Sequence, residues 1–204
     1  MQDRVVAYID GFNLYYGLKS ASWKRFYWLD LQALCSNLLI SGQNLVMTKY
    51  FTSRIASPGD KQVRQAKYIE ALETLSDFQI YYGRFQSNLR KCRQCGFREM
   101  VPNEKMTDVN IATELLRDAF QDRFDTALLV SADSDLTALL RTIRELFPGK
   151  RVIVVFPPMR HSSQLQLIAH GYMTIGRATI ARSLFASVVM KANGFPLRRP
   201  PEWS

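Results

Sequence analysis

The stretch Val5-Val6-Ala7-Tyr8-Ile9-Asp10-Gly11-Phe12-Asn13 decides the fold of this chain. An apolar run of this length, closed by an acidic residue and a glycine, is typical of a buried parallel strand. A second run of the same form, Thr126-Ala127-Leu128-Leu129-Val130, leads into Ser131-Ala132-Asp133-Ser134-Asp135. In an open α/β sheet the ligand crevice lies outside the carboxyl ends of the strands. Asp10, Asp133 and Asp135 are therefore predicted to lie at that crevice.

Strand-like and helix-like patterns alternate along the rest of the chain, which favours an α/β fold with a mainly parallel central sheet covered by helices. Further strands are expected at residues 45–51, 78–85, 151–156 and 172–175. Asp30 is a plausible N-cap for a helix over residues 31–39, and Thr107 for a helix that runs to about residue 120. Other helices are expected near residues 14–19, 60–75, 136–146 and 165–168.

The 204 residues suit a single α/β domain, which we place at residues 1–185. Residues 88–103 break the alternation and are predicted to form an inserted hairpin or loop. Residues 186–204 form a C-terminal extension, whose prolines at 196, 200 and 201 favour a loose or surface-bound segment.

Several features of the sequence indicate the cellular compartment of the protein. No apolar stretch of about 18 residues occurs, so no membrane span is expected. The N-terminus lacks the pattern of a signal peptide. Three cysteines are too few for a disulfide scaffold. Together these features predict a cytoplasmic protein.

The chain carries a net charge of +9 and has an isoelectric point near 9.6. A basic surface favours polyanions, of which nucleic acid is the commonest. A protein that is basic overall but acidic at one crevice is typical of a metal-dependent enzyme that acts on a phosphate backbone.

Asp108 adds a third acidic element to the predicted crevice. It lies in the first turn of the helix after Thr107, and the residues four and seven positions later, Ala112 and Leu115, are both apolar. Asp108 therefore shares the inward side of that helix. Each acid also has an ordinary explanation, since turns, N-caps and first helical turns favour aspartate. Their convergence instead predicts a site for Mg²⁺ or Mn²⁺, which prefer oxygen ligands.

Three segments resemble the motifs of the NYN domain family, which belongs to the PIN-like nuclease superfamily. They are residues 5–15, residues 105–112 (Lys-Met-Thr-Asp-Val-Asn-Ile-Ala) and residues 128–136 (Leu-Leu-Val-Ser-Ala-Asp-Ser-Asp-Leu), in the family's order and spacing. The resemblance extends from about Arg4 to Arg182 and is closest to the bacterial LabA-like branch. It implies a three-layer α/β/α sandwich with PIN-like, Rossmann-like topology and ribonuclease activity that depends on a divalent metal.

The resemblance also implies roles for individual residues. Asp10, Asp108 and Asp133 match the metal-binding acids of the family, and Asp135 matches a fourth. Asn13 matches an asparagine that would orient a water or a phosphate. Ser131 and Ser134 match hydroxyls that would support the metal ligands. Met106 departs from the pattern, because many relatives have glycine there.

Basic residues near the expected crevice are candidates for substrate binding. Several of them are accompanied by aromatic side chains in the sequence, a combination that suits phosphate contacts and base stacking. The candidates are Lys19, Lys24, Arg25, Arg54, Lys105 and Arg160. A second basic and aromatic cluster surrounds the inserted loop at Arg84, Arg90, Lys91, Arg93 and Arg98, for which a solvated hairpin is an equal alternative.

Cys92 and Cys95 have the Cys-x-x-Cys spacing of half a zinc site. The chain has no second cysteine pair, and His161 and His170 lie on other elements. Zinc held within one chain and a four-cysteine site completed by a homodimer are two open alternatives. Reduced thiols in a turn are the simpler interpretation.

These features predict a ribonuclease that hydrolyses RNA, single-stranded or structured, with water activated by Mg²⁺ or Mn²⁺. The alternative is a non-catalytic regulator that binds RNA or a protein in the same groove. A phosphatase of the haloacid dehalogenase type is excluded because position 12 is phenylalanine rather than aspartate. A nucleotide-binding Rossmann enzyme is excluded because no G-x-G-x-x-G follows the first strand.

Overall fold

The computed structural model describes residues 2–55, 59–91 and 94–203, with the backbone alone for 85–90 and 99–104. Its centre is a six-stranded sheet in the order β3-β2-β1-β6-β7-β8, in which every neighbouring pair is parallel. The strands are β1 (Asp3–Asp10), β2 (Gln43–Thr52), β3 (Phe78–Tyr82), β6 (Thr126–Val130), β7 (Arg151–Phe156) and β8 (Gly171–Thr174).

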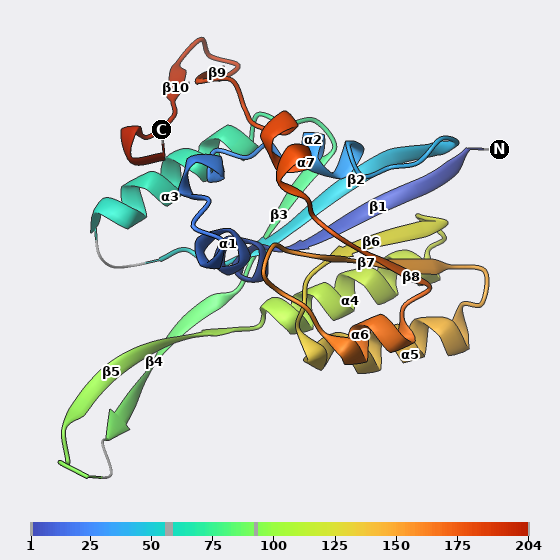
Figure 1. Cartoon of the computed structure of the whole chain (residues 1–204), viewed down its shortest axis with the longest axis horizontal. Coiled ribbons are helices and arrows are strands. Elements are labelled where there is room, and N and C mark those ends of the chain that lie inside the picture. Colours follow the sequence, from blue (N-terminus) through green and yellow to red (C-terminus); the bar gives the residue numbers. More distant parts are fainter. Residues whose placement is uncertain (1, 56–58, 92–93, 204) are drawn as a thin grey trace.

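Helices cover both faces of this sheet (Figure 1). One layer holds α1 (Gly11–Ser20), α2 (Leu31–Ser36), α3 (Gly59–Leu72) and α7 (Arg177–Arg182). The other holds α4 (Thr107–Phe120), α5 (Thr137–Leu146) and α6 (Ser163–Ile168). Side chains of β1 alternate between the two layers, so both of its faces are buried and its central stretch, residues 5–9, is apolar. The predicted α/β/α sandwich is confirmed.

The order of the strands reverses between β1 and β6. The chain runs outward from β1 through β2 to β3 and then returns to β6 on the other side of β1. Ile9 lies opposite Val130 in the parallel ladder, so the residues that follow both strands meet at one edge. This is the topological switch point, where α/β proteins bind ligands.

Two helix caps were predicted, and only one is correct. Asp30 caps α2, and its carboxylate accepts a hydrogen bond of 2.8 Å from the backbone N–H of Ala33. Thr107 is not the cap of α4, because the N-cap is Met106, which has φ 82° and makes no side-chain capping bond. Glycine adopts this left-handed conformation without strain, which explains why many relatives have glycine at the position of Met106.

The strand expected at residues 78–85 is present, but its predicted C-terminal end is wrong. β3 stops at Tyr82, and after Gly83 the chain enters β4 (Arg84–Lys91), which pairs antiparallel with β5 (Arg98–Lys105). The alternation of Ile80, Tyr82 and Arg84 is imperfect, so the sequence left the end of this strand open and did not show the change of partner strand. The β4–β5 hairpin, here called the arm, projects away from the sandwich (Figure 1).

The C-terminal segment lies on the surface and is packed against it. It forms β9 (Val188–Met190), β10 (Pro196–Arg198) and the short helix η3 (Pro201–Trp203). Leu197 and Trp203 are buried against Trp28, whose indole N–H donates a 2.8 Å hydrogen bond to the carbonyl of Ala186. Trp28 follows the short helix η1 (Lys24–Phe26), so this segment covers η1 and α3. Among the residues described, no helix is long and apolar enough to cross a membrane.

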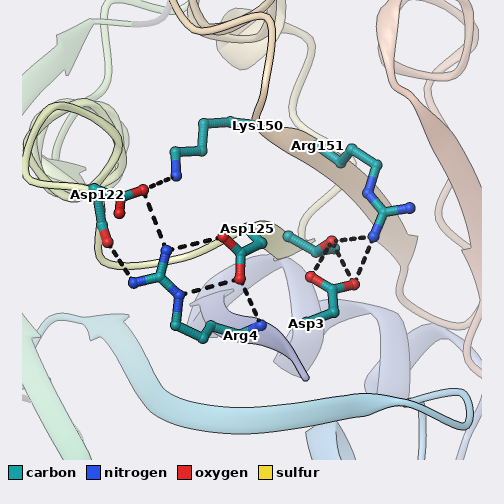
Figure 2. A network of polar contacts seen from close by, with 7 residues as sticks. Asp3, Arg4, Asp122, Asp125, Lys150 and Arg151 are labelled. Atoms are coloured by element: carbon teal, nitrogen blue, oxygen red, sulfur yellow. Dashed lines mark hydrogen bonds and ion pairs between the residues drawn. The ribbon is translucent and has the colours of Figure 1, made fainter. Parts of the chain in front are cut away.

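Charged residues join the strands at the amino edge of the sheet, the edge opposite the switch point (Figure 2). Arg4 holds Asp125 through two side-chain hydrogen bonds of 3.1 and 2.8 Å and also reaches Asp122, which pairs with Lys150. These contacts connect the start of β1 with the turns that lead into β6 and β7. The hydrogen bonds from Arg4 hold the pKa of Asp125 well below its usual range.

We expect Asp125→Asn to lower the melting temperature at pH 7 and to flatten its acid dependence. An aspartate whose pKa is lowered by folding stabilises the protein above its ordinary value of 3.8, and this stabilisation is lost as the pH falls through and below that value. Melting curves between neutral pH and pH 3 measure the effect. Asp77→Asn is the control, since Asp77 is exposed on the same edge and has φ 49°, which asparagine also tolerates. Equal curves for the wild type and Asp125→Asn would contradict the expectation.

A buried charged cluster fixes α4 to the sheet. Lys49 of β2 is 1% exposed, and its ammonium lies 2.8 Å from Glu114 and 2.6 Å from Asp118 of α4. Tyr8 donates a 2.6 Å hydrogen bond to Asp118, and Tyr81 donates one of 2.7 Å to Glu114. Burial works against the ionised form of Glu114, but the hydrogen bonds from Lys49 and Tyr81 prevail and lower its pKa.

Lys49→Met should lower the free energy of unfolding by about 3–5 kcal/mol, because it removes the buried cation that two buried carboxylates share and, among the described residues, leaves them only the more exposed Arg117 and Arg123. Urea unfolding measures the loss. Adding Glu114→Gln and Asp118→Asn to Lys49→Met should recover much of it, since the uncompensated charges are then removed. A single variant as stable as the wild type would show that the cluster does not hold α4 in place.

Candidate active site

Asp10 is the innermost acid at the switch point. It ends β1, caps α1 and is 2% exposed. One carboxylate oxygen accepts a 3.0 Å hydrogen bond from the backbone N–H of Asn13, and the other accepts bonds from the Asn13 amide (2.6 Å) and the Ser131 hydroxyl (3.0 Å). Burial raises the pKa of Asp10 and the charge of Asp133 adds to this, while the hydrogen bonds from Asn13 and Ser131 oppose it.

Ser131 links this acid to Asp133. Its buried hydroxyl donates to Asp10 and accepts a 3.1 Å hydrogen bond from the backbone N–H of Asp133. Asn13 makes a second link, because its side-chain oxygen accepts a long 3.4 Å bond from the backbone N–H of Ala132. The structure thus joins two motifs that lie about 120 residues apart. Ser134, by contrast, is exposed at the start of the short helix η2 (Ser134–Leu136).

The turn from β1 into α1 requires a glycine. A Cβ atom at Gly11 would lie 2.8 Å from the carbonyl oxygen of Phe51 and 2.7 Å from the ring of Tyr50. The start of α1 therefore lies directly against β2, which places the first turn of the helix, with Asn13, at the switch point.

Asp108 and Asp135 lie at a neighbouring hollow. Both line a hollow of about 490 Å³ between α4 and the segment from η2 into α5, with Val109, Ala112, Leu136 and Thr142 among its other residues. Asp108 is half-buried and Asp135 is exposed. Within the part of the chain that the structure describes, no three histidine, cysteine, aspartate or glutamate side chains lie close enough together to hold a metal ion. The structure thus places Asp10 and Asp133 at the switch point and Asp108 and Asp135 along the hollow, and the prediction that all four serve one site stays untested.

The donors around Asp10 nevertheless fit a hard divalent cation. Mg²⁺ is commonly held by one or two carboxylates and keeps several waters, so the pair Asp10 and Asp133 meets that need. A carboxylate offers about four lone-pair positions, and Asp10 uses three for hydrogen bonds. A cation would also relieve the burial and like-charge repulsion that raise the pKa of Asp10.

Three of the predicted basic residues lie over exposed tyrosine rings. Lys19 and Arg160 both lie over Tyr16 of α1, with 5.7 and 5.8 Å from each charged group to the ring centroid. Arg54, just after β2, lies 4.9 Å from the ring centroid of Tyr82 at the end of β3 and donates a 3.0 Å hydrogen bond to its hydroxyl. The structure therefore brings Lys19 and Arg160 together and leaves Arg54 as a separate group.

The remaining predicted residues are more dispersed. Lys24 and Arg25 are exposed on η1, where the guanidinium of Arg25 lies 4.8 Å from the ring centroid of Phe26. Lys105 is the exposed last residue of β5, three positions before Asp108. Cys95 is exposed near the tip of the arm, and Cys92 lies outside the described residues, so the zinc prediction stays untested.

Sequence reasoning missed Tyr16. It is 43% exposed and is shared by two cations that come from distant parts of the chain. Its spacing of three residues from Lys19 on a helix was a usable signal for that contact. The contact with Arg160 depends on tertiary structure alone.

Comparisons with known proteins agree with this geometry. The family model described as NYN domain matches residues 4–180. The chain belongs to the NYN domain family. This places the protein in the PIN-like nuclease superfamily, whose NYN members generally act on nucleic acid and use divalent metals.

Individual relatives of this NYN protein are distant. It is 30% identical over 191 residues to 6-hydroxy-3-succinoylpyridine 3-monooxygenase HspA from Pseudomonas putida, a match that covers 76% of this chain and 59% of that protein. The chain thus spans less than two thirds of the length of that relative. A crystal structure of a Vibrio parahaemolyticus protein of unknown function has the same fold, with a TM-score of 0.57 at 18% identity over 90% of this chain and 97% of the other.

Ser131→Ala should lower the unfolding free energy of this NYN domain by about 1–3 kcal/mol, because it leaves a buried backbone N–H and a buried carboxylate each short of one partner. Ser134→Ala is the matched control and should stay within about 0.5 kcal/mol, since Ser134 is exposed. Chemical denaturation of both variants measures the difference. Equal stabilities would show that the Ser131 bridge does not organise the site.

Proposed function

We propose that this NYN protein is an endoribonuclease that depends on Mg²⁺ or Mn²⁺. The observation that carries the proposal is the buried Asp10 carboxylate at the switch point, joined to Asp133 through Ser131. Burying an acid beside a second acid costs stability, and acids whose pKa is perturbed in this way in a crevice often mark functional sites.

In this proposal Asp10 and Asp133 hold the divalent ion, and Asp108 and Asp135 act from the neighbouring hollow. Asn13 and Ser131 keep the Asp10 carboxylate in one orientation through their hydrogen bonds. A divalent ion bound there supplies two effects: it lowers the pKa of a bound water and stabilises the oxygens that attack and leave the phosphorus. The expected products have 5′-phosphate and 3′-hydroxyl ends.

Exposed cations and rings beside the site support RNA as the substrate. Lys19 and Arg160 surround Tyr16, and Arg54 lies over Tyr82. Cations of this kind contact phosphates, and aromatic faces stack with bases that are not paired. Lys24, Arg25 and Lys105 would extend these contacts along the strand.

Two other functions remain to be tested beside this one. A regulator that binds RNA or a protein without cleaving it would use the same groove. The activity that the name of the Pseudomonas relative prints, oxygenation of 6-hydroxy-3-succinoylpyridine, gives a second enzyme class to assay.

We expect the purified protein to cleave RNA with Mn²⁺ or Mg²⁺, and Asp10→Asn and Asp133→Asn each to lower the rate by more than a hundredfold. Loss of a supporting residue around a metal ligand costs about 10- to 100-fold, and loss of a ligand should cost more. Rates come from gel assays on RNA and DNA panels. Asp77→Asn changes the same charge on an exposed turn away from the site and should keep the wild-type rate.

Calorimetry with Mn²⁺ separates the alternatives. Binding by the wild type and its loss in Asp10→Asn support the nuclease. RNA binding without Mn²⁺ binding or cleavage would favour the regulator, and consumption of the pyridine substrate would favour the oxygenase. Cleavage by Asp10→Asn at the wild-type rate would disprove the assigned role of this acid.

A further inference from the structure

We propose that the arm is an RNA-binding element that holds the substrate strand beyond the groove through its phosphates. This inference rests on the proposed function, because it names how the same substrate is held. It assigns a role to a structural feature that the catalytic site does not use.

The first observation is the position of the arm. It starts at Arg84, two residues after β3 ends at Tyr82, and it ends at Lys105, three residues before Asp108. The base of the arm therefore lies at the carboxyl edge of the sheet, beside the acids of the site. Its strands form a sheet of their own and extend away from the sandwich (Figure 1).

The second observation is its charge. Residues 84–105 contain six lysines and arginines and two glutamates, which gives a net charge of +4 out of +9 for the whole chain. Nearly half of the excess positive charge thus lies in 22 residues. A concentration of this kind on an extended element fits a polyanion.

The third observation is the register of the arm. Arg84 lies opposite Lys105 at the base, and Lys91 lies opposite Arg98 near the tip. All four side chains are exposed, and none takes part in the ion pairs found among the described residues. Like charges directly opposite each other destabilise a hairpin. Bound phosphates would neutralise the repulsion between the like charges at both ends of the arm.

The length of the arm suits an extended ligand. Seven residue steps separate the two basic pairs, which corresponds to about 24 Å along a strand. Near the tip, Phe97 is 64% exposed and offers a ring face on which a base can stack. An RNA strand that passes the acids can therefore reach cations at the base and then at the tip.

The test is RNA binding by the full chain in the presence of EDTA, so that no cleavage occurs. Fluorescence anisotropy with a labelled single-stranded RNA gives the affinity at several concentrations of monovalent salt. The variant Lys91→Gln/Arg98→Gln removes the pair near the tip. It should bind RNA more weakly, and the slope of log K against log salt should become shallower by about 1.4, because each lost phosphate contact contributes about 0.7.

The matched control is Arg177→Gln/Arg182→Gln, which removes the same charge from exposed positions on α7. It should change the salt slope by much less than the arm variant does. Melting curves check folding, and the arm variant should be at least as stable as the wild type because a like-charge pair has been removed.

The inference fails if the arm variant keeps the affinity and salt slope of the wild type, or if the α7 control loses as much. Unchanged RNA binding would leave an acidic protein as the occupant of the arm. Failure of the proposed function is a separate result: a protein that binds RNA through the arm but does not cleave it with Mn²⁺ retains this inference and loses the nuclease.

Discussion

The parallel pairing of β1 with β6 is the constraint on which the rest of the site depends. Because Ile9 lies opposite Val130, Asp10 and Ser131 leave the sheet side by side, and their hydrogen bond follows. A slip of one residue would turn the alternating side chains of β1 to the wrong faces, and both faces are buried. The register is thus fixed by the different packing on the two buried faces, where Tyr8 meets Asp118 on one of them, and the polar site is a consequence of it.

Helix α4 also helps to position the candidate site. Lys49 draws Glu114 and Asp118 to β2, so the C-terminal half of the helix is held by charge as well as by apolar contacts. Asp108 lies at the other end of the same helix. Its position beside the hollow shared with Asp135 therefore depends on a buried cluster some distance from the acids themselves.

Acids at the amino ends and at the carboxyl ends of the parallel strands have different surroundings. At the amino ends of the strands, acids such as Asp125 and Asp3 have basic partners, Arg4 and Arg151. At the carboxyl edge Asp10 and Asp133 are near each other, and the ion pairs among the described residues include neither. The first arrangement stabilises the fold, and the second is the one that the proposed metal site would require. The likeness to a Vibrio protein at 18% identity shows that this fold tolerates extensive change in sequence.

The sequence by itself determined the sandwich and the central strands, and it singled out four acids as candidates for the site. A strand that is buried on both faces has a continuous apolar run, and in β1 this run is followed by turn residues. The local pattern was therefore sufficient to predict this strand. Only the tertiary structure decided that Asp10 joins Asp133 through Ser131, that Tyr16 meets Arg160, and that Lys49 lies buried against Glu114 and Asp118. It also decided that β3 ends at Tyr82 and that the basic hairpin projects as an arm. These features depend on partners far away along the chain, and local periodicity carries no information about such partners.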